Sequence, residues 1–166
     1  DLRNYSWESE GVGMIKEDGF ILRKLKKGDE ISISKHGNNK KIAENLTEAF
    51  PHPYTLEEGK KFVNYCIKND AEDYGIEISE EIVGMIGLSG KEDYKKEIGY
   101  WISEYYWGKG IMTQAIKSLI YEAFNKNSKL EKIQARVYLH NPASVRVLEK
   151  LGFKREGLLR KDSRIY

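Results

Sequence analysis

The pattern of apolar and polar positions predicts short strands separated by helices. Alternating or continuous apolar runs predict four strands, at residues 20–25, 74–79, 82–88 and 97–102. The polar pair Glu80 and Glu81 has the length of a two-residue loop, so the second and third runs should form an antiparallel hairpin. Gly99 lies inside the fourth run, where an isolated glycine is typical of a bulge.

Helical spacing occurs between and after these strands. Residues 26–50 carry weak helical patterning broken near Gly37, which predicts two short helices. Thr55 and Glu58 form a capping box for a helix over residues 56–68. The clearest helix covers residues 111–125, where apolar side chains recur every three or four positions.

The C-terminal part predicts a strand over residues 132–140, a short helix, and a further strand beginning at residues 153–159. Asn141 as N-cap, Pro142 at the first helical position and Gly152 after the last turn delimit the helix. The predicted order is β-α-α-β-β-β-α-β-α-β. It describes a mixed-sheet α/β (α+β) domain with helices on both faces of the sheet.

Composition favours one folded, soluble domain. A length of 166 residues fits a single domain over residues 1–166, with a core at about residues 20–159. A net charge of +2 argues against bulk nucleic-acid binding, and the absence of a long apolar run argues against a membrane span and favours a cytoplasmic protein. The sequence leaves open whether the natural protein extends past Asp1 and Tyr166.

Cysteine and histidine give no sign of a metal or disulfide site. Cys66 is the single cysteine, so an internal disulfide and a thiolate zinc site are excluded, and its helical position favours a small core residue. His36, His52 and His140 are scattered without metal-ligand spacing, and we interpret them as surface or structural side chains.

A glycine turn at the start of the long helix is the first candidate site. The sequence Trp107-Gly108-Lys109-Gly110 follows a predicted strand and opens the helix, where free backbone N–H groups and the helix dipole bind anions. The alternative is a glycine turn without a ligand. Thr113 stands where a third glycine of a dinucleotide motif would be, so binding of NAD is disfavoured.

Four segments resemble the GNAT acetyltransferases, particularly the branch of ribosomal-protein N-terminal alanine acetyltransferases (RimJ/RimL-like). They are PYTLEEGKKFV (53–63), EIVGMIGL (81–88), EIGYWISEYYWGKGIMTQAI (97–116) and NPASVRVLEKLGFKREG (141–157). These segments stand in family order and at family spacing, and the similarity covers most of residues 20–159. The resemblance implies the GNAT fold and acetyl-CoA as cosubstrate, without a metal.

The resemblance also implies a set of cofactor-binding residues. The pyrophosphate of acetyl-CoA would lie on the backbone of Trp107, Gly108, Lys109, Gly110, Ile111, Met112 and Thr113. The pantetheine arm would pair with the main chain of Tyr100, Trp101 and Ile102 and accept a contact from Asn141. Ser144 would stand near the thioester sulfur, and Lys150 is a candidate for the 3′-phosphate.

Two features depart from the family pattern. Tyr105 occupies the position where the turn motif usually has Gln or Arg, so a side-chain contact made there is lost while backbone N–H groups still serve. Family members generally continue with two further strands after the Gly-Phe segment. The resemblance therefore implies that part of the acceptor pocket lies beyond Tyr166.

The expected chemistry is direct attack of an amine on the thioester. Ser144 is the candidate general acid for the departing thiolate, with a first-turn structural role as its alternative. Glu97 is the candidate base acting through a water, with a solvated strand-end charge as its alternative, and a backbone N–H near Trp101 would stabilise the oxyanion. Tyr54, Tyr105 and Tyr106 are candidates to line the acceptor cleft.

Three functions remain open from the sequence. The favoured one is N-acetylation of a protein N-terminal α-amino group, since its pKa near 7.7–8.0 leaves part of it neutral at pH 7. The acceptor would then be a protein, on family resemblance a ribosomal one. A small-molecule amine such as a polyamine, amino acid or aminoglycoside is the second function, and a non-catalytic acyl-CoA-binding module is the third. A polyamine would require an acidic cleft, whereas a peptide would require an open groove with a backbone-pairing edge.

Overall fold

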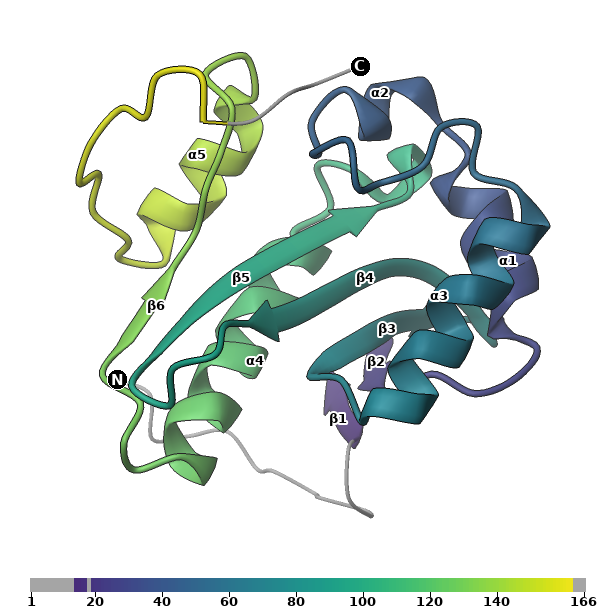
Figure 1. Ribbon diagram of the computed structural model, residues 1–166, viewed down its shortest axis with the longest axis horizontal. Helices are drawn as coiled ribbons and strands as arrows, with labels where there is room; N and C mark the ends of the chain where they lie inside the picture. Colours follow the sequence, from purple (N-terminus) through teal and green to yellow (C-terminus); the bar gives the residue numbers. More distant parts are fainter. Residues whose placement is uncertain (1–13, 18, 163–166) are drawn as a thin grey trace.

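A six-stranded mixed sheet forms the centre of the computed structural model, which describes residues 14–17 and 19–162 (Figure 1). The strands lie in chain order: β1 (Met14–Glu17), β2 (Phe20–Arg23), β3 (Asp73–Ile78), β4 (Glu81–Ser89), β5 (Lys95–Ile102) and β6 (Lys132–Gln134). Neighbouring strands are antiparallel except β5 and β6, which are parallel.

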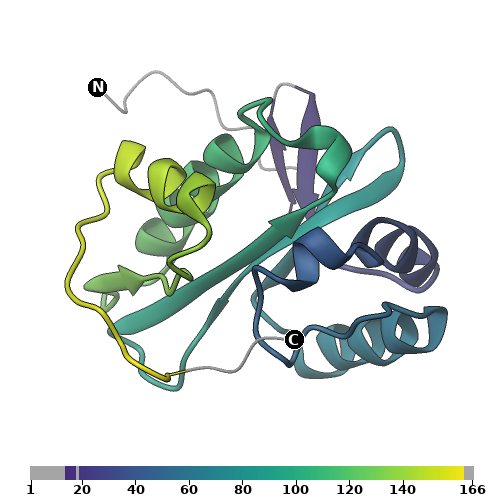
Figure 2. The same cartoon turned by 90° about the horizontal axis from the view of Figure 1, so that it is seen from above.

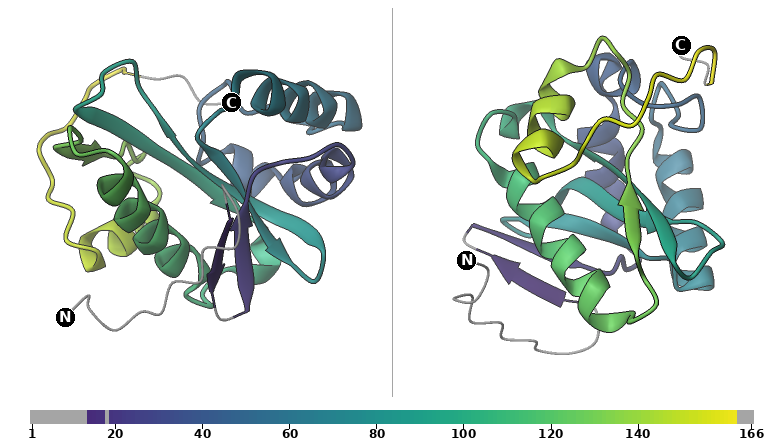
Figure 3. Two further views of the ribbon diagram at one scale, coloured as in Figure 1. Left: turned by 90° about the horizontal axis from the view of Figure 1, so that it is seen from below. Right: turned by 90° about the vertical axis from the view of Figure 1, so that its left-hand side faces the viewer.

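Helices cover both faces of the sheet (Figure 2). On one face lie α1 (Asp29–Gly37), α2 (Lys40–Ala43) and α3 (Leu56–Asn69), and on the other lie α4 (Ile111–Lys126) and α5 (Pro142–Lys150). A 3-10 turn, η1 (Glu104–Tyr106), leads from β5 toward α4. Figure 3 shows the same division from two further sides, and the mixed α/β fold with two covered faces agrees with the fold class predicted from the sequence.

Two apolar layers fill the space between sheet and helices. Buried side chains on the α4 side include Ile76, Ile86 and Ile116, and those on the α3 side include Ile33 and Val63. Strand β4 contributes to both layers, so its sequence is almost continuously apolar instead of alternating.

Several predicted boundaries shift in the structure. The hairpin turn between β3 and β4 is Ser79–Glu80, because both residues adopt positive φ (50° and 65°) as a two-residue hairpin loop requires, and Glu81 belongs to β4. Gly99 pairs regularly with Gly87, and the register shift lies at Ile76/Glu77. The pattern also missed β1. The three helices between β2 and β3 match the two short helices and the capped helix expected from the spacing, although the predicted element order counts only two helices there.

Of the two predicted C-terminal strands, the first is shorter than expected and the second is absent. Only Lys132–Gln134 pairs with β5, and residues 135–140 then diverge from it. Residues 153–159 form no strand, because no described strand pairs with them, and Leu158 and Leu159 are exposed. The alternating pattern over residues 132–140 arises because one side of this segment packs against the protein core and the other side faces solvent.

Candidate active site

A groove opens where β5 and the chain after β6 diverge, and we call it the β5 groove. Pairing ends at Glu97 and Gln134, so no described strand pairs with the rest of β5 on that edge. The groove has a volume of about 2080 Å³, and residues 135–140 and α5 form its far wall (Figure 1). Ile98 and Tyr100 line it from the α4 side, and Gly99 and Trp101 line it from the α3 side, so the groove reaches both faces of the sheet.

The glycine turn adopts a conformation that leaves its N–H groups open. Gly108 (φ 71°) and Gly110 (φ 78°) are left-handed, and an added Cβ at either would meet nothing within 4 Å. Gly110 is the N-cap of α4, and no side chain among the described residues caps this first turn. The orphan N–H groups and the positive end of the helix dipole can therefore hold an anion.

Two aromatic contacts fix this turn beside the end of β5. Trp107 Nε1 donates a hydrogen bond of 2.8 Å to the carbonyl oxygen of Ile102. Lys109 Nζ lies 4.1 Å from the centroid of the Tyr105 ring and 5.2 Å from that of Tyr106. Tyr105 and Tyr106 thus contact the Lys109 ammonium group. They do not line the groove, contrary to the prediction that they line the acceptor cleft.

A pair of hydroxyl groups bridges β5 and α5. The hydroxyls of Tyr100 and Ser144 lie 2.5 Å apart, and the Asn141 side chain accepts a hydrogen bond of 3.2 Å from the Ser144 backbone N–H. Burial raises the pKa of the Tyr100 hydroxyl, while the hydrogen bond to Ser144 acts in the opposite direction. The phenol therefore stays protonated at neutral pH and can donate its proton.

Ser144 was predicted from the sequence as a site residue, whereas Tyr100 was expected to contribute only its main chain. The missed signal is the alternation in β5, which puts Tyr100 on the same side as Ile98 and Ile102, facing α5. Lys150 lies at the opposite end of α5 from Ser144, is exposed, and is not among the residues that line the groove.

Glu97 has partners that occupy its carboxylate. Arg136 Nε lies 3.1 and 3.0 Å from its two oxygens, and Gln134 Nε2 donates a hydrogen bond of 3.2 Å. Arg136 also forms an ion pair of 3.0 Å with Asp162. Glu97 thus links the two walls of the groove, and it would have to leave a guanidinium to act as a base.

Aromatic side chains close the groove on the α3 side. Phe50 lies 5.0 Å from Tyr54 and 5.7 Å from Trp101 between ring centroids. All three line the groove, as the sequence predicted for Tyr54. Burial, the largest cause, raises the pKa of Tyr54 to about 12.

Two of the three histidines, His36 and His140, serve as hydrogen-bonding groups, whereas the buried Nδ1 of His52 has no partner among the described residues. His36 Nδ1 lies 3.2 Å from Ser103 Oγ and its Nε2 lies 2.6 Å from a Glu81 oxygen, while His140 Nε2 contacts the carbonyl of Glu44 at 2.8 Å. Within residues 14–17 and 19–162, no group of three or more His, Cys, Asp or Glu residues could hold a metal ion. The helices described there are also too short or too polar to cross a membrane.

Comparison with known proteins identifies the family. The family model for the acetyltransferase (GNAT) domain matches residues 20–154. A ribosomal-protein-serine acetyltransferase of Escherichia coli (strain K12) is 34% identical over 83 residues, which cover 49% of this chain and 46% of that protein. A probable N-acetyltransferase of Bacillus subtilis (strain 168), YjcK, is 46% identical over 68 residues, which cover 41% of this chain and 37% of that protein. The chain spans about half the length of the curated relatives it matches.

A solved structure is similar over a greater length. The spermidine N-acetyltransferase from Vibrio cholerae, in complex with CoA and spermine, has a TM-score of 0.74 and 26% identity, covering 90% of this chain and 89% of that chain. The glycine turn, the open edge of β5 and the family match agree with one another, and the chain belongs to the GNAT acetyltransferase family.

Proposed function

We propose that this chain transfers the acetyl group of acetyl-CoA to a primary amine, with a protein N-terminal α-amino group as the favoured acceptor. The observation that carries the proposal is the continuity of three features along β5. A strand edge without a partner runs from the Tyr100–Ser144 hydroxyl pair to the glycine turn of α4.

Each part of acetyl-CoA has a complementary group on this path. The N–H groups of residues 108–113 suit the pyrophosphate, with Lys109 adding a positive charge. The free edge of β5 suits the amide groups of the pantetheine arm, in the manner of an added strand. The side chain of Asn141 caps α5 through its oxygen, and its amide N–H groups have no partner among the described residues, so they can contact the same arm.

The hydroxyl pair supplies the proton that the departing sulfur needs. Acetyl-CoA provides the acetyl group as a thioester when it is bound. Ser144 Oγ can donate to the sulfur and be reprotonated by Tyr100 across their 2.5 Å contact. A backbone N–H near Trp101 on the β5 edge is positioned to stabilise negative charge on the carbonyl oxygen.

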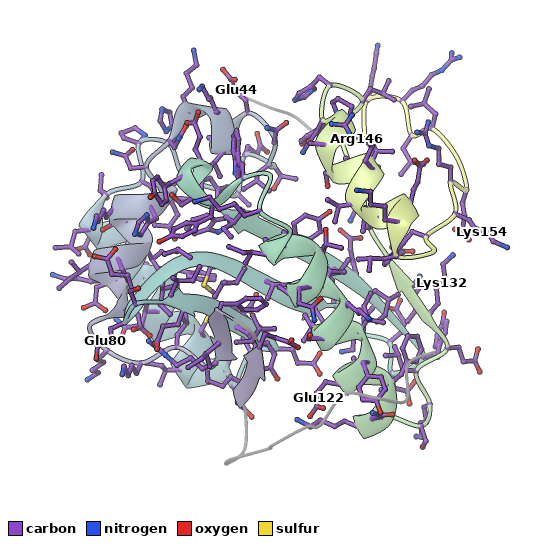
Figure 4. The ribbon with its side chains drawn as sticks, turned by 180° about the vertical axis from the view of Figure 1, so that it is seen from behind. Glu44, Glu80, Glu122, Lys132, Arg146 and Lys154 are labelled. Atoms are coloured by element: carbon purple, nitrogen blue, oxygen red, sulfur yellow. The ribbon has the colours of Figure 1, made fainter. Side chains whose placement is uncertain are left out.

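The charge of the groove is mixed, and this supports a peptide acceptor over a polyamine only because the described residues form no acidic cleft. Glu97, Glu149 and Glu156 line it but each is paired with an Arg or Lys. Arg146 and Lys154 add positive charge to the C-terminal wall, opposite the half that carries Glu44 and Glu80 (Figure 4). Acidic and basic residues line the groove in equal numbers, so it lacks the excess of negative charge that a polyamine would require.

The acceptor preference also draws support from the relatives. The similarity to a ribosomal-protein-serine acetyltransferase supports a ribosomal protein as partner and a cytoplasmic location. The similarity to a spermidine N-acetyltransferase keeps a small amine as the second candidate, since one fold hosts many acceptors.

The proposal is tested by release of free CoA from acetyl-CoA in the presence of peptides beginning with Ser or Ala, spermidine, free amino acids and an aminoglycoside. Turnover on the peptides alone is the expected result. Turnover on a small amine alone would show that the acceptor is a small molecule and not a protein N-terminus. Binding of acetyl-CoA in calorimetry without turnover on any acceptor would instead indicate the non-catalytic acyl-CoA-binding module.

A further inference from the structure

A trough crosses the sheet on the α3 side of the β5 groove, and its floor lacks side chains. In the strand register Asp73 of β3 pairs with Gly87 of β4, and Gly87 pairs with Gly99 of β5. Residues two positions away on the same strands lie on the same face. They form the two sides of the trough: Met85 and Trp101 on one, and Ser89 and Glu97 on the other.

Asp73 points its carboxylate along this trough. A Cβ added to Gly87 would lie 2.1 Å from Asp73 Oδ1, so the carboxylate occupies the space above that glycine. A Cβ added to Gly99 would meet nothing within 4 Å. Since neighbouring strands lie about 5 Å apart, the carboxylate is roughly one strand spacing from Gly99 and the open edge of β5.

The Asp73 carboxylate has no hydrogen-bond or ion-pair partner among the described residues, although Asp73 lines the groove. The cation facing it is Lys24, whose Nζ lies 3.4 Å from Asp70 and donates to the carbonyl oxygen of Ala71. Burial raises the pKa of Asp73, and Lys24 lowers it in part. A half-buried carboxylate is unfavourable without a partner, so this position is suited to a cation from outside the chain.

We propose that Asp73 binds the ammonium group of the acceptor and is the base that removes its proton. The inference rests on the proposed function. A nitrogen held by Asp73 on the side toward β5 lies above Gly99, next to the edge that suits the thioester. The open space above Gly99 leaves room for the amine-bearing carbon of the acceptor. Asp73 takes this role in place of Glu97, whose oxygens are bound by Arg136.

The proton and bond changes balance. The ammonium gives one proton to Asp73, and the freed electron pair of nitrogen forms the C–N bond. As the C–S bond breaks, sulfur takes a proton from the Ser144–Tyr100 pair. A second proton leaves nitrogen through groove water and restores that pair. Asp73 then releases its proton to water, so one proton is released for each ammonium acetylated.

Asp73→Asn tests the inference directly, because the amide keeps the shape and removes the charge. We expect kcat/KM for the acceptor that the wild type uses to fall by about 100-fold or more, within the usual range for a general base, with the acetyl-CoA dissociation constant unchanged. The acidic limb of the pH profile should disappear. Glu131→Gln, which neutralises an exposed carboxyl lining the same groove, is the matched control and should leave the rate unchanged.

Gly99→Val is a second variant that leaves the carboxylate intact. Its side chain enters open space on a strand, so the fold should hold, but it fills the floor of the trough. We expect the acceptor KM to rise at least tenfold. The inference would be overturned if either variant, Asp73→Asn or Gly99→Val, had the same kcat/KM as the wild type.

A readout without turnover separates this inference from the proposed function. In 13C NMR of the wild type, added glycinamide or 1,4-diaminobutane should lower the pKa of the Asp73 carboxyl, since a bound cation favours its charged form. No change with either amine would overturn the role of Asp73. Failure of the wild type to bind acetyl-CoA would overturn the proposed function, while the NMR result still decides the role of Asp73.

Discussion

The hydroxyl groups of Tyr100 and Ser144 act as a unit at the residue scale. The two groups come from different elements: Ser144 lies in the first turn of α5, and Tyr100 lies half-buried on β5. Burial keeps the phenol protonated, and the 2.5 Å contact gives it one direction in which to donate. This arrangement suits a proton donor facing a leaving group that would otherwise depart as an anion.

Ser144→Ala should lower kcat by about 100-fold, because the proton relay to sulfur is broken, while acetyl-CoA affinity changes by less than threefold. Steady-state kinetics with calorimetric titration of acetyl-CoA measure both quantities. Ser128→Ala, an exposed serine after α4, is the control and should leave kcat unchanged. An unchanged kcat in Ser144→Ala would remove Ser144 from the mechanism.

At the element scale, side-chain contacts fix α1 against the ends of β4 and β5. His36 near the end of α1 contacts Ser103 after β5 and Glu81 at the start of β4, and Lys35 pairs with the same carboxylate at 2.8 Å. These contacts hold α1 beside Trp101, so this wall of the β5 groove is built by hydrogen bonds as well as by apolar packing.

Helix α3 covers a layer that is sensitive to alkaline pH. Burial raises the pKa of the Cys66 thiol from its ordinary 9.0 to about 12 and that of Tyr54 from 10.0 to about 12. Unfolding exposes both groups, which then ionise at their ordinary values. Their contribution to stability is complete below pH 9 and is lost progressively as pH rises from 9 toward 12.

We expect the free energy of unfolding to fall between pH 8 and pH 10.5, with Cys66 contributing about 2 kcal/mol of that fall at 1.36 kcal/mol per pKa unit. Urea unfolding at the two pH values measures the change. Cys66→Ala should have a lower free energy of unfolding than the wild type at pH 8, because packing is lost. Between pH 8 and pH 10.5, however, its free energy of unfolding should fall by about 2 kcal/mol less than that of the wild type. An equal fall in wild type and variant would contradict the burial of a neutral thiol.

At the scale of the whole molecule, the sequence predicted the parts whose structure depends on local pattern. The Thr55 N-cap, the long apolar stripe of α4 and the Asn141–Pro142 helix start are confirmed, because each depends on residues within one or two turns. The Glu58 side chain pairs with Lys61, so the reciprocal bond of a capping box is not formed. Gly108 and Gly110, in the turn before α4, have the positive φ values that the glycine turn predicted from the sequence allows.

Features that depend on long-range pairing could not be predicted in this way. The alternation over residues 132–140 gives no sign that pairing with β5 ends at Gln134. The Tyr100–Ser144 contact joins residues 44 positions apart, and the trough beside Asp73 requires the register of three strands. Single-chain periodicity gives the face of a residue but not its partner across the fold.

Calorimetric titration of acetyl-CoA into the wild type, Gly108→Val and Gly28→Val tests the central claim most directly. Gly28 also has positive φ (102°) and open space around it, but it lies at the start of α1, so it controls for backbone strain. We predict binding in the wild type and in Gly28→Val, and affinity at least tenfold weaker in Gly108→Val, because the turn no longer presents its N–H groups. No binding in the wild type, or equal affinity in Gly108→Val, would contradict the account.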